Sequence, residues 1–187
     1  MVSIKLKGRE IPLIYTVLEM KTIQEEIGPL DKAINYLMGK DPEKEGEEKS
    51  IAGSPEHIET VAKTVRILGN AGLEEAGEEP DLTDRLVLRS MKPNEFANAM
   101  NKCIEAMNEA MQSEIPEKKS EEPVDVTLAE IKKKKSEGKL TYLMVVSWGL
   151  IAGLSLPEIH RMRPGAVMDL FLYRRQYDDV MHWITRG

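Results

Sequence analysis

The stretch TVLEMKTIQEEIG, residues 16–28, marks the point at which the sequence changes from strand-like to helical periodicity. Four apolar side chains recur in it at helical spacing: Val17, Met20, Ile23 and Ile27. Thr16 is a suitable N-cap, and Gly28 followed by Pro29 is a typical stop signal. The stretch therefore predicts an amphipathic helix, and it indicates a fold that is mainly α.

The residues before this helix predict a short β-hairpin. Ser3 to Lys7 alternates polar and apolar side chains, Gly8-Arg9-Glu10 supplies a turn, and Ile11 to Tyr15 resumes an extended apolar run. The hairpin would precede a helical body.

The residues after it predict further helices. A second helix is expected around Leu30 to Met38, after which Lys40 to Ser50 has the composition of a charged loop. Ser54 followed by Pro55 predicts the start of a third helix, which we expect to end at Asn70-Ala71-Gly72 and Gly77 to Pro80. Two more helices are expected at Leu82 to Met91 and from Asn94, as N-cap, to Met111.

A change in composition at residues 112–139 predicts the domain organisation. This segment has two prolines, dense mixed charge and few apolar residues, so we expect a flexible linker that proteases cut between Ser113 and Lys139. It would join a helical N-terminal domain with a β-hairpin, residues 1–111, to a small helical C-terminal region, residues 140–187. In that region Leu140 to Leu150 predicts a helix, Ser155 and Glu158 suit a capping box, and Pro164-Gly165 begins the last helix.

Composition narrows the classes of function. The chain of 187 residues is 41% hydrophobic, only 5% aromatic, and contains eleven methionines, which favours a helical core of aliphatic and thioether side chains. The net charge is −6, and residues 1–111 hold 21 acidic against 14 basic residues, so the front half is poorly suited to nucleic acid. The sequence has no apolar run long enough to predict a membrane span, and we expect a soluble protein.

Patterns that carry catalysis are absent from the sequence. The three histidines, His57, His160 and His182, have no second ligand at metal-site spacing, and phosphate-binding loops and nucleophile elbows do not occur. Cys103 is the only cysteine and falls on the apolar face of a predicted helix, which indicates an unreactive core thiol. We therefore expect no enzyme activity, no cofactor and no metal.

A helix-turn-helix regulator is one alternative. Gly149 to Ile159 followed by another helix has the cadence of that motif. However, the would-be recognition helix opens with Ala166-Val-Met-Asp-Leu-Phe, and base edges call for Arg, Asn or Gln instead.

Aromatic residues are concentrated near the C-terminus, which predicts a protein-binding surface. Aromatic residues, Met and Arg dominate protein interfaces. We expect Phe171 to share a stripe with Tyr177 and Met181, with Tyr173 and Arg174 to its side. The candidate partner-binding residues are Trp148, Met162, Met168, Tyr173, Arg174, Tyr177 and Trp183.

The order of these features resembles the tail assembly chaperones of long-tailed bacteriophages and related prophages. The resemblance rests on IKLKGREIPLIYT, LEMKTIQEEIG, the charged linker and the terminal W-G-L…RMRPGAVMDLFLYRRQYDD segment. In that family a short product and an extended one commonly arise by ribosomal slippage, for which the Lys132 to Lys135 cluster is a candidate position.

The resemblance implies a protein that binds and solubilises the tape-measure protein, recruits tail-tube subunits and self-associates. It implies action in the host cytoplasm and absence from the mature virion. A structural component that stays in the virion is a further alternative.

Overall fold

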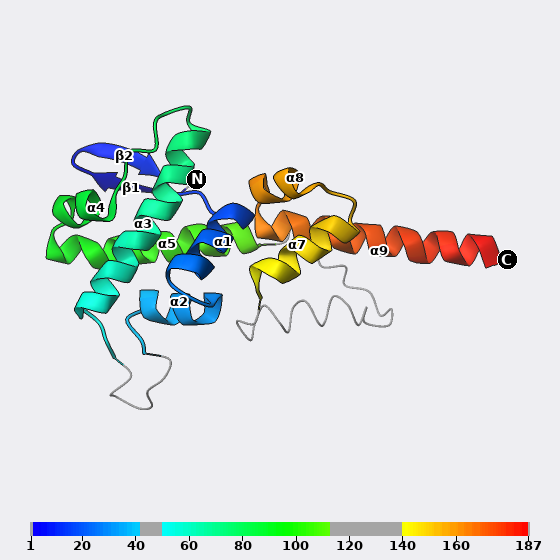
Figure 1. Ribbon diagram of the computed structural model, residues 1–187, viewed down its shortest axis with the longest axis horizontal. Coiled ribbons are helices and arrows are strands. Elements are labelled where there is room, and N and C mark those ends of the chain that lie inside the picture. The colour runs from blue at the N-terminus through cyan, green and yellow to red at the C-terminus, as the bar shows by residue number, and fades with distance from the viewer. Residues whose placement is uncertain (1, 42–49, 113–139, 187) are drawn as a thin grey trace.

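The computed structural model describes residues 2–41, 50–112 and 140–186, with side chains described as far as Asp178. The described chain is mainly helical and begins with a two-stranded antiparallel hairpin, as predicted (Figure 1). The elements are, in order, β1 (Ser3–Leu6), β2 (Arg9–Pro12), α1 (Val17–Glu26), α2 (Leu30–Leu37), α3 (Pro55–Glu75), α4 (Asp84–Ser90), the 3₁₀ turn η2 (Pro93–Glu95), α5 (Phe96–Met111), α7 (Tyr142–Ile151), α8 (Leu156–Arg161) and α9 (Pro164–Arg186).

The hairpin turns one residue earlier than the sequence suggests. Lys7 and Gly8 occupy the turn with φ values of +49° and +84°, and Leu6 pairs with Arg9. Two successive positive φ angles belong to the turn type whose twist matches that of the flanking strands, and glycine accepts such an angle without strain. Arg9 therefore belongs to β2 rather than to the turn.

The third helix does not end at Asn70-Ala71-Gly72, because α3 runs through these residues to Glu75. Gly72 is there because the hairpin approaches the helix closely: a Cβ added to it would lie 2.0 Å from the Pro12 carbonyl oxygen. The Asn70 side chain accepts from the Leu82 N–H and donates to its carbonyl oxygen, at 3.0 and 3.1 Å. Residues typical of a helix end thus serve tertiary contacts here.

Most of the expected caps are confirmed. Thr16 and Ser54 cap α1 and α3, and Ser155 with Glu158 forms the capping box of α8. Asn94 is not an N-cap, since it lies inside η2, where the Glu95 carboxylate accepts from the Lys92 N–H at 2.8 Å.

The C-terminal helices pack against the N-terminal body. Helices α7 and α8 contact α1, and α9 contacts both α5 and α7. The two parts contribute to one cluster of buried apolar side chains, whose C-terminal members are Leu140, Val145, Ile159, Val167, Met168, Phe171 and Leu172. The proposed linker falls almost wholly at residues 113–139, which lie outside the described residues, so the expected domain division stays a prediction.

Candidate partner-binding surface

The histidines with described side chains have structural roles. Nδ1 of His57 accepts from the Gly53 N–H at 3.0 Å. Its Nε2 lies 3.1 Å from the Leu37 carbonyl oxygen, and because that oxygen can only accept, Nε2 is the donor. Nε2 of His160 lies 2.8 Å from the Tyr142 hydroxyl. Among the residues of the chain that the structure describes, no three His, Cys, Asp or Glu side chains lie where they could hold a metal ion together.

Cys103 is confirmed as a core residue. Its side chain on α5 is fully buried, and this burial raises the pKa of the thiol to about 12. A thiol with such a pKa stays protonated at neutral pH and is a poor nucleophile.

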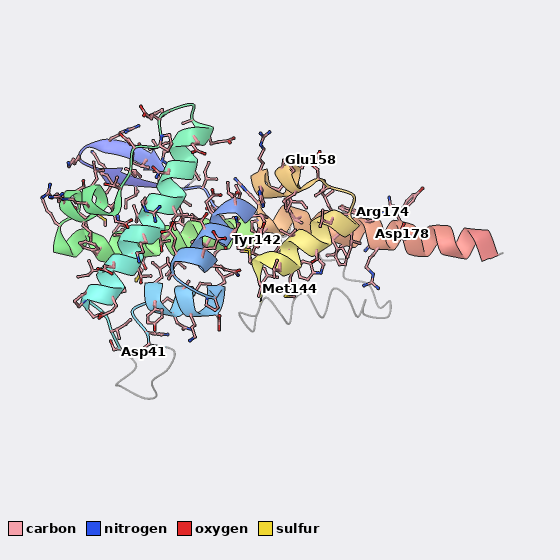
Figure 2. All side chains as sticks on the ribbon, in the orientation of Figure 1. Asp41, Tyr142, Met144, Glu158, Arg174 and Asp178 are labelled. Carbon is pink, nitrogen blue, oxygen red and sulfur yellow. The ribbon has the colours of Figure 1, made fainter. Side chains whose placement is uncertain are left out.

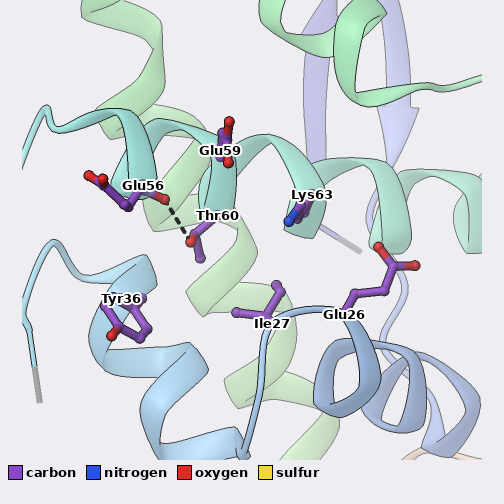
Figure 3. A pocket seen from close by; sticks show the side chains of 7 residues that line it. All are labelled: Glu26, Ile27, Tyr36, Glu56, Glu59, Thr60 and Lys63. Atoms are coloured by element: carbon purple, nitrogen blue, oxygen red, sulfur yellow. Dashed lines mark hydrogen bonds between the residues drawn. The ribbon is translucent and has the colours of Figure 1, made fainter.

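A shallow depression of about 190 Å³ lies where the end of α1 meets α2 and α3 (Figure 3). Its lining residues are Glu26, Ile27, Tyr36, Glu56, Glu59, Thr60 and Lys63. The Thr60 hydroxyl donates to the Glu56 carbonyl oxygen at 2.8 Å, and the Glu26 carboxylate is paired with Arg66. Thr60 and Glu26 therefore make contacts within the fold.

Exposed apolar side chains gather in the C-terminal helices. Nine large apolar side chains are exposed among the described residues, and only Leu18 and Met38 belong to the body. The other seven are Leu143, Leu150, Ile151, Leu156, Leu170, Tyr173 and Tyr177. Large exposed apolar groups that cluster in this way mark an interaction surface.

The outer face of α9 carries part of this surface. Core residues Val167, Met168 and Phe171 are buried, and Phe171 stacks on Trp148 of α7, while Leu170, Tyr173 and Tyr177 recur on the opposite side of the helix. Tyr173 and Tyr177 are 56% and 57% exposed. We call Leu170, Tyr173 and Tyr177 the α9 face.

Arg174 lies beside the two tyrosines. Its guanidinium carbon is 5.9 Å from the centre of the Tyr177 ring, and its Nε lies 3.3 Å from an Asp178 carboxylate oxygen. Figure 2 labels Arg174 and Asp178 where α9 leaves the body. The stripe expected to join Phe171 with Tyr177 is wrong, because six residues at 100° each place the two side chains on different faces.

Trp148, Met162 and Met168, three other predicted partner-binding residues, lie deeper. Trp148 is half-buried and stacks on Phe171, with ring centres 5.7 Å apart. Met168 is 3% exposed, so it is part of the core, and Met162 is half-buried. Trp183 lies on α9, but its side chain is outside the description. The structure thus brings Tyr173, Arg174 and Tyr177 together at the surface.

Sequence reasoning missed the apolar outer side of α7. Leu143 is 71% exposed, Leu150 54% and Ile151 59%. The available signal was the absence of any charged residue from Tyr142 to Ile151, since a helix that is apolar all round must be covered on every side.

The start of α9 is not presented to solvent. Pro164, Gly165 and Val167 are buried, and a Cβ on Gly165 would lie 2.3 Å from the Gln112 carbonyl oxygen. A helix-turn-helix motif needs this end of its recognition helix exposed to enter the major groove. The packing therefore counts against the regulator alternative.

In the described part of the chain, no helix combines the length and apolar character needed to cross a membrane. Comparison with family models, curated proteins and solved structures gives no match.

Proposed function

We propose that this chain is an assembly chaperone that works by binding other proteins, and that residues 140–178 carry its partner-contacting surface. The observation that supports this proposal is the α9 face with its two exposed tyrosines, beside which Arg174 lies. Buried Tyr, Trp and Arg side chains provide most of the binding energy at protein interfaces.

The resemblance to tail assembly chaperones supplies the partners in this proposal. The tape-measure protein is the client that the chain keeps soluble, and the tail-tube subunit is the protein that the α9 face recruits. Both steps would take place in the host cytoplasm, and the chaperone would be absent from the finished particle.

The test uses the full chain, because the C-terminal helices are part of the core. Removing residues 140–187 would uncover the buried Ala110 on α5 and deprive the Val17 N–H of its acceptor, so point variants at exposed positions are cleaner than truncation. Co-expression with the tail-tube and tape-measure proteins, followed by pull-down, measures the two interactions separately.

We expect Tyr173→Ala and Tyr177→Ala to weaken capture of the tail-tube subunit by about tenfold or more, as loss of an aromatic anchor commonly does. Arg174→Ala should weaken this capture less than either tyrosine change does, because the exposed ion pair between Arg174 and Asp178 contributes only about 0.5 kcal/mol. Gln176→Ala, an exposed change on the same helix, is the matched control. Circular dichroism should show every variant folded. Unchanged capture by both tyrosine variants would contradict the assignment to the α9 face.

A further inference from the structure

One row of residues along α9 has the spacing of a seam between two paired helices. Beginning with the residue before the helix, its members are separated alternately by three and four positions: Arg163, Ala166, Leu170, Tyr173 and Tyr177. The last three are the α9 face. Apolar side chains that alternate in this way line the seam along which one helix packs on another. The α9 face therefore has the form of a surface for a partner helix.

The core does not account for this row, because the buried apolar residues of α9 form a separate one. These are Val167, Met168, Phe171 and Leu172. Toward its C-terminal end α9 runs past the other helices (Figure 1), and every residue from Tyr173 to Asp178 is exposed. A second helix can lie along this stretch without displacing part of the fold.

The charged groups that border the row are cationic. Arg174 directly follows Tyr173, and in a seam of this spacing the side chain at that position pairs with a charge on the partner helix. Arg163 stands at the start of the row. It is exposed, and its side chain has no hydrogen-bond or ion-pair partner within the described part of the chain.

The carboxylates of residues 140–178 are already engaged. Glu158 accepts from the Ser155 N–H and hydroxyl, Asp169 is buried and has a partner of its own, and Asp178 pairs with Arg174. A guanidinium has five N–H donors, so Arg174 can bind a second carboxylate as well. Helix α7, which packs against α9, has no charged residue. The charge that this surface can still accept is therefore negative.

We propose that the α9 face docks an acidic amphipathic helix of a partner protein. The apolar row of that helix packs against the α9 face, and its carboxylates pair with Arg163 and Arg174. The apolar contacts provide most of the affinity, and the arginines select the partner by its charge. This inference rests on the proposed function, since it names the chemistry of the partner that the α9 face recruits.

A second copy of the chain does not supply this chemistry through its own α9. The residues that border the seam of α9 are Arg174 on one side and Gln176 on the other, so two such seams would bring no free carboxylate to either arginine.

The probes are two synthetic helical peptides of about three heptads that differ only in charge. Both carry Leu at the seam positions. The positions that border the seam are all Glu in one peptide and all Lys in the other, which also keeps each peptide from pairing with itself. Binding of each labelled peptide to the full chain is measured by fluorescence anisotropy.

The Glu peptide should bind at least about tenfold more tightly than the Lys peptide at low salt, because one makes two ion pairs where the other meets two like charges. The difference should shrink as salt is added. The net charge of −6 would by itself give the opposite order, since the chain as a whole attracts cations. Preference for the Glu peptide would therefore report the local charge of the α9 surface.

Charge reversal tests the two arginines directly. In the double variant Arg163→Glu, Arg174→Glu, the Lys peptide should become the tighter ligand. Arg175→Glu is the matched control, because residue 175 is an exposed arginine on the opposite side of α9 from the α9 face, and this variant should still prefer the Glu peptide. Circular dichroism should show both variants folded.

Three results with the peptides would overturn the proposal: binding of the Lys peptide that is equal or tighter, an unchanged order in the double variant, and binding of neither peptide up to about 1 mM. A dimer in sedimentation that Tyr173→Ala dissociates would also overturn it, because a second copy would then cover the face. If the tyrosine variants lose the tail-tube subunit but the unmodified chain does not distinguish the peptides, the proposed function stands and this inference fails.

Discussion

The backbone N–H of Val17 donates a 2.9 Å hydrogen bond to the carbonyl oxygen of Met162. Val17 is the first residue of α1, where N–H groups have no acceptor within their own helix. The loop that follows α8 supplies that acceptor, and the Thr16 hydroxyl oxygen lies 2.7 Å from the His160 carbonyl oxygen beside it. The start of α1 is therefore one place where the N-terminal body is hydrogen-bonded to the C-terminal region.

Thr16→Ala should lower the free energy of unfolding by about 1 kcal/mol, the usual loss when an N-cap is removed. The side chain accepts from the Leu18 N–H at 3.2 Å and lies against the C-terminal region, so amide hydrogen exchange should also quicken in α8. Thr22→Ala, which removes a hydroxyl bonded only within α1, is the control and should stay within about 0.5 kcal/mol. If urea denaturation showed equal losses of unfolding free energy for Thr16→Ala and Thr22→Ala, the link from Thr16 to the C-terminal region would not contribute to stability.

Gly72→Ala should destabilise the protein, although Ala is ordinarily the better helix former by about 1 kcal/mol. The added Cβ would lie 2.0 Å from the Pro12 carbonyl oxygen, so the hairpin must move away from α3. We expect a loss of about 1–3 kcal/mol in urea denaturation, as for other overpacked sites. A gain in stability would show that β2 does not approach α3 so closely.

Phe171→Ala should destabilise the fold rather than weaken partner binding directly. The side chain is buried and stacks on Trp148 of α7, and loss of a core Phe typically costs about 3–5 kcal/mol. Tyr173→Ala, two residues away and exposed, should change stability by less than about 0.5 kcal/mol. Thermal unfolding followed by circular dichroism distinguishes the two. Similar melting temperatures for both variants would be inconsistent with a buried Phe171 and an exposed Tyr173 on α9.

Stability should fall as the pH rises above about 9. Burial raises the pKa of the Cys103 thiol from 9.0 to about 12, so between these values the unfolded chain releases a proton that the folded chain keeps. The unfolded state then binds fewer protons, and the free energy of unfolding decreases with pH. Burial also raises the pKa of Tyr15, which adds to the trend.

Cys103→Ala removes the contribution of the thiol from this pH dependence. Between pH 8 and about pH 10.5, the unmodified chain should lose about 1–2 kcal/mol more than the variant. Urea denaturation at the two pH values measures the difference. Identical losses would mean that the thiol is accessible to solvent in the folded chain.

Features that depend on neighbours along the chain were predictable from the sequence. Thr16, Ser54 and the pair Ser155 and Glu158 cap helices through atoms at most three residues away, so local sequence determines them. Asn70 and Gly72 were misassigned because Leu82 and Pro12 determine their roles, and those contacts exist only in the folded chain.

The candidate surface was predictable only in part. The sequence pointed to Tyr173, Arg174 and Tyr177, whose tyrosines are exposed, but composition does not give the helical phase that buries Met168. Leu143 and Ile151 were missed because an apolar helix is ordinarily a core helix, and only the packed structure shows which side of it lacks a neighbour.

The bond between Val17 and Met162 has a consequence for the order of folding during translation. Val17 leaves the ribosome long before Met162, so a body that folds during synthesis forms while the first N–H groups of α1 and the end of α5 still lack their C-terminal partners. The last helices complete this nascent body and close its open side. A shorter translation product that stopped before residue 140 would keep that side open, and it would differ from the full chain in its core as well as in its length.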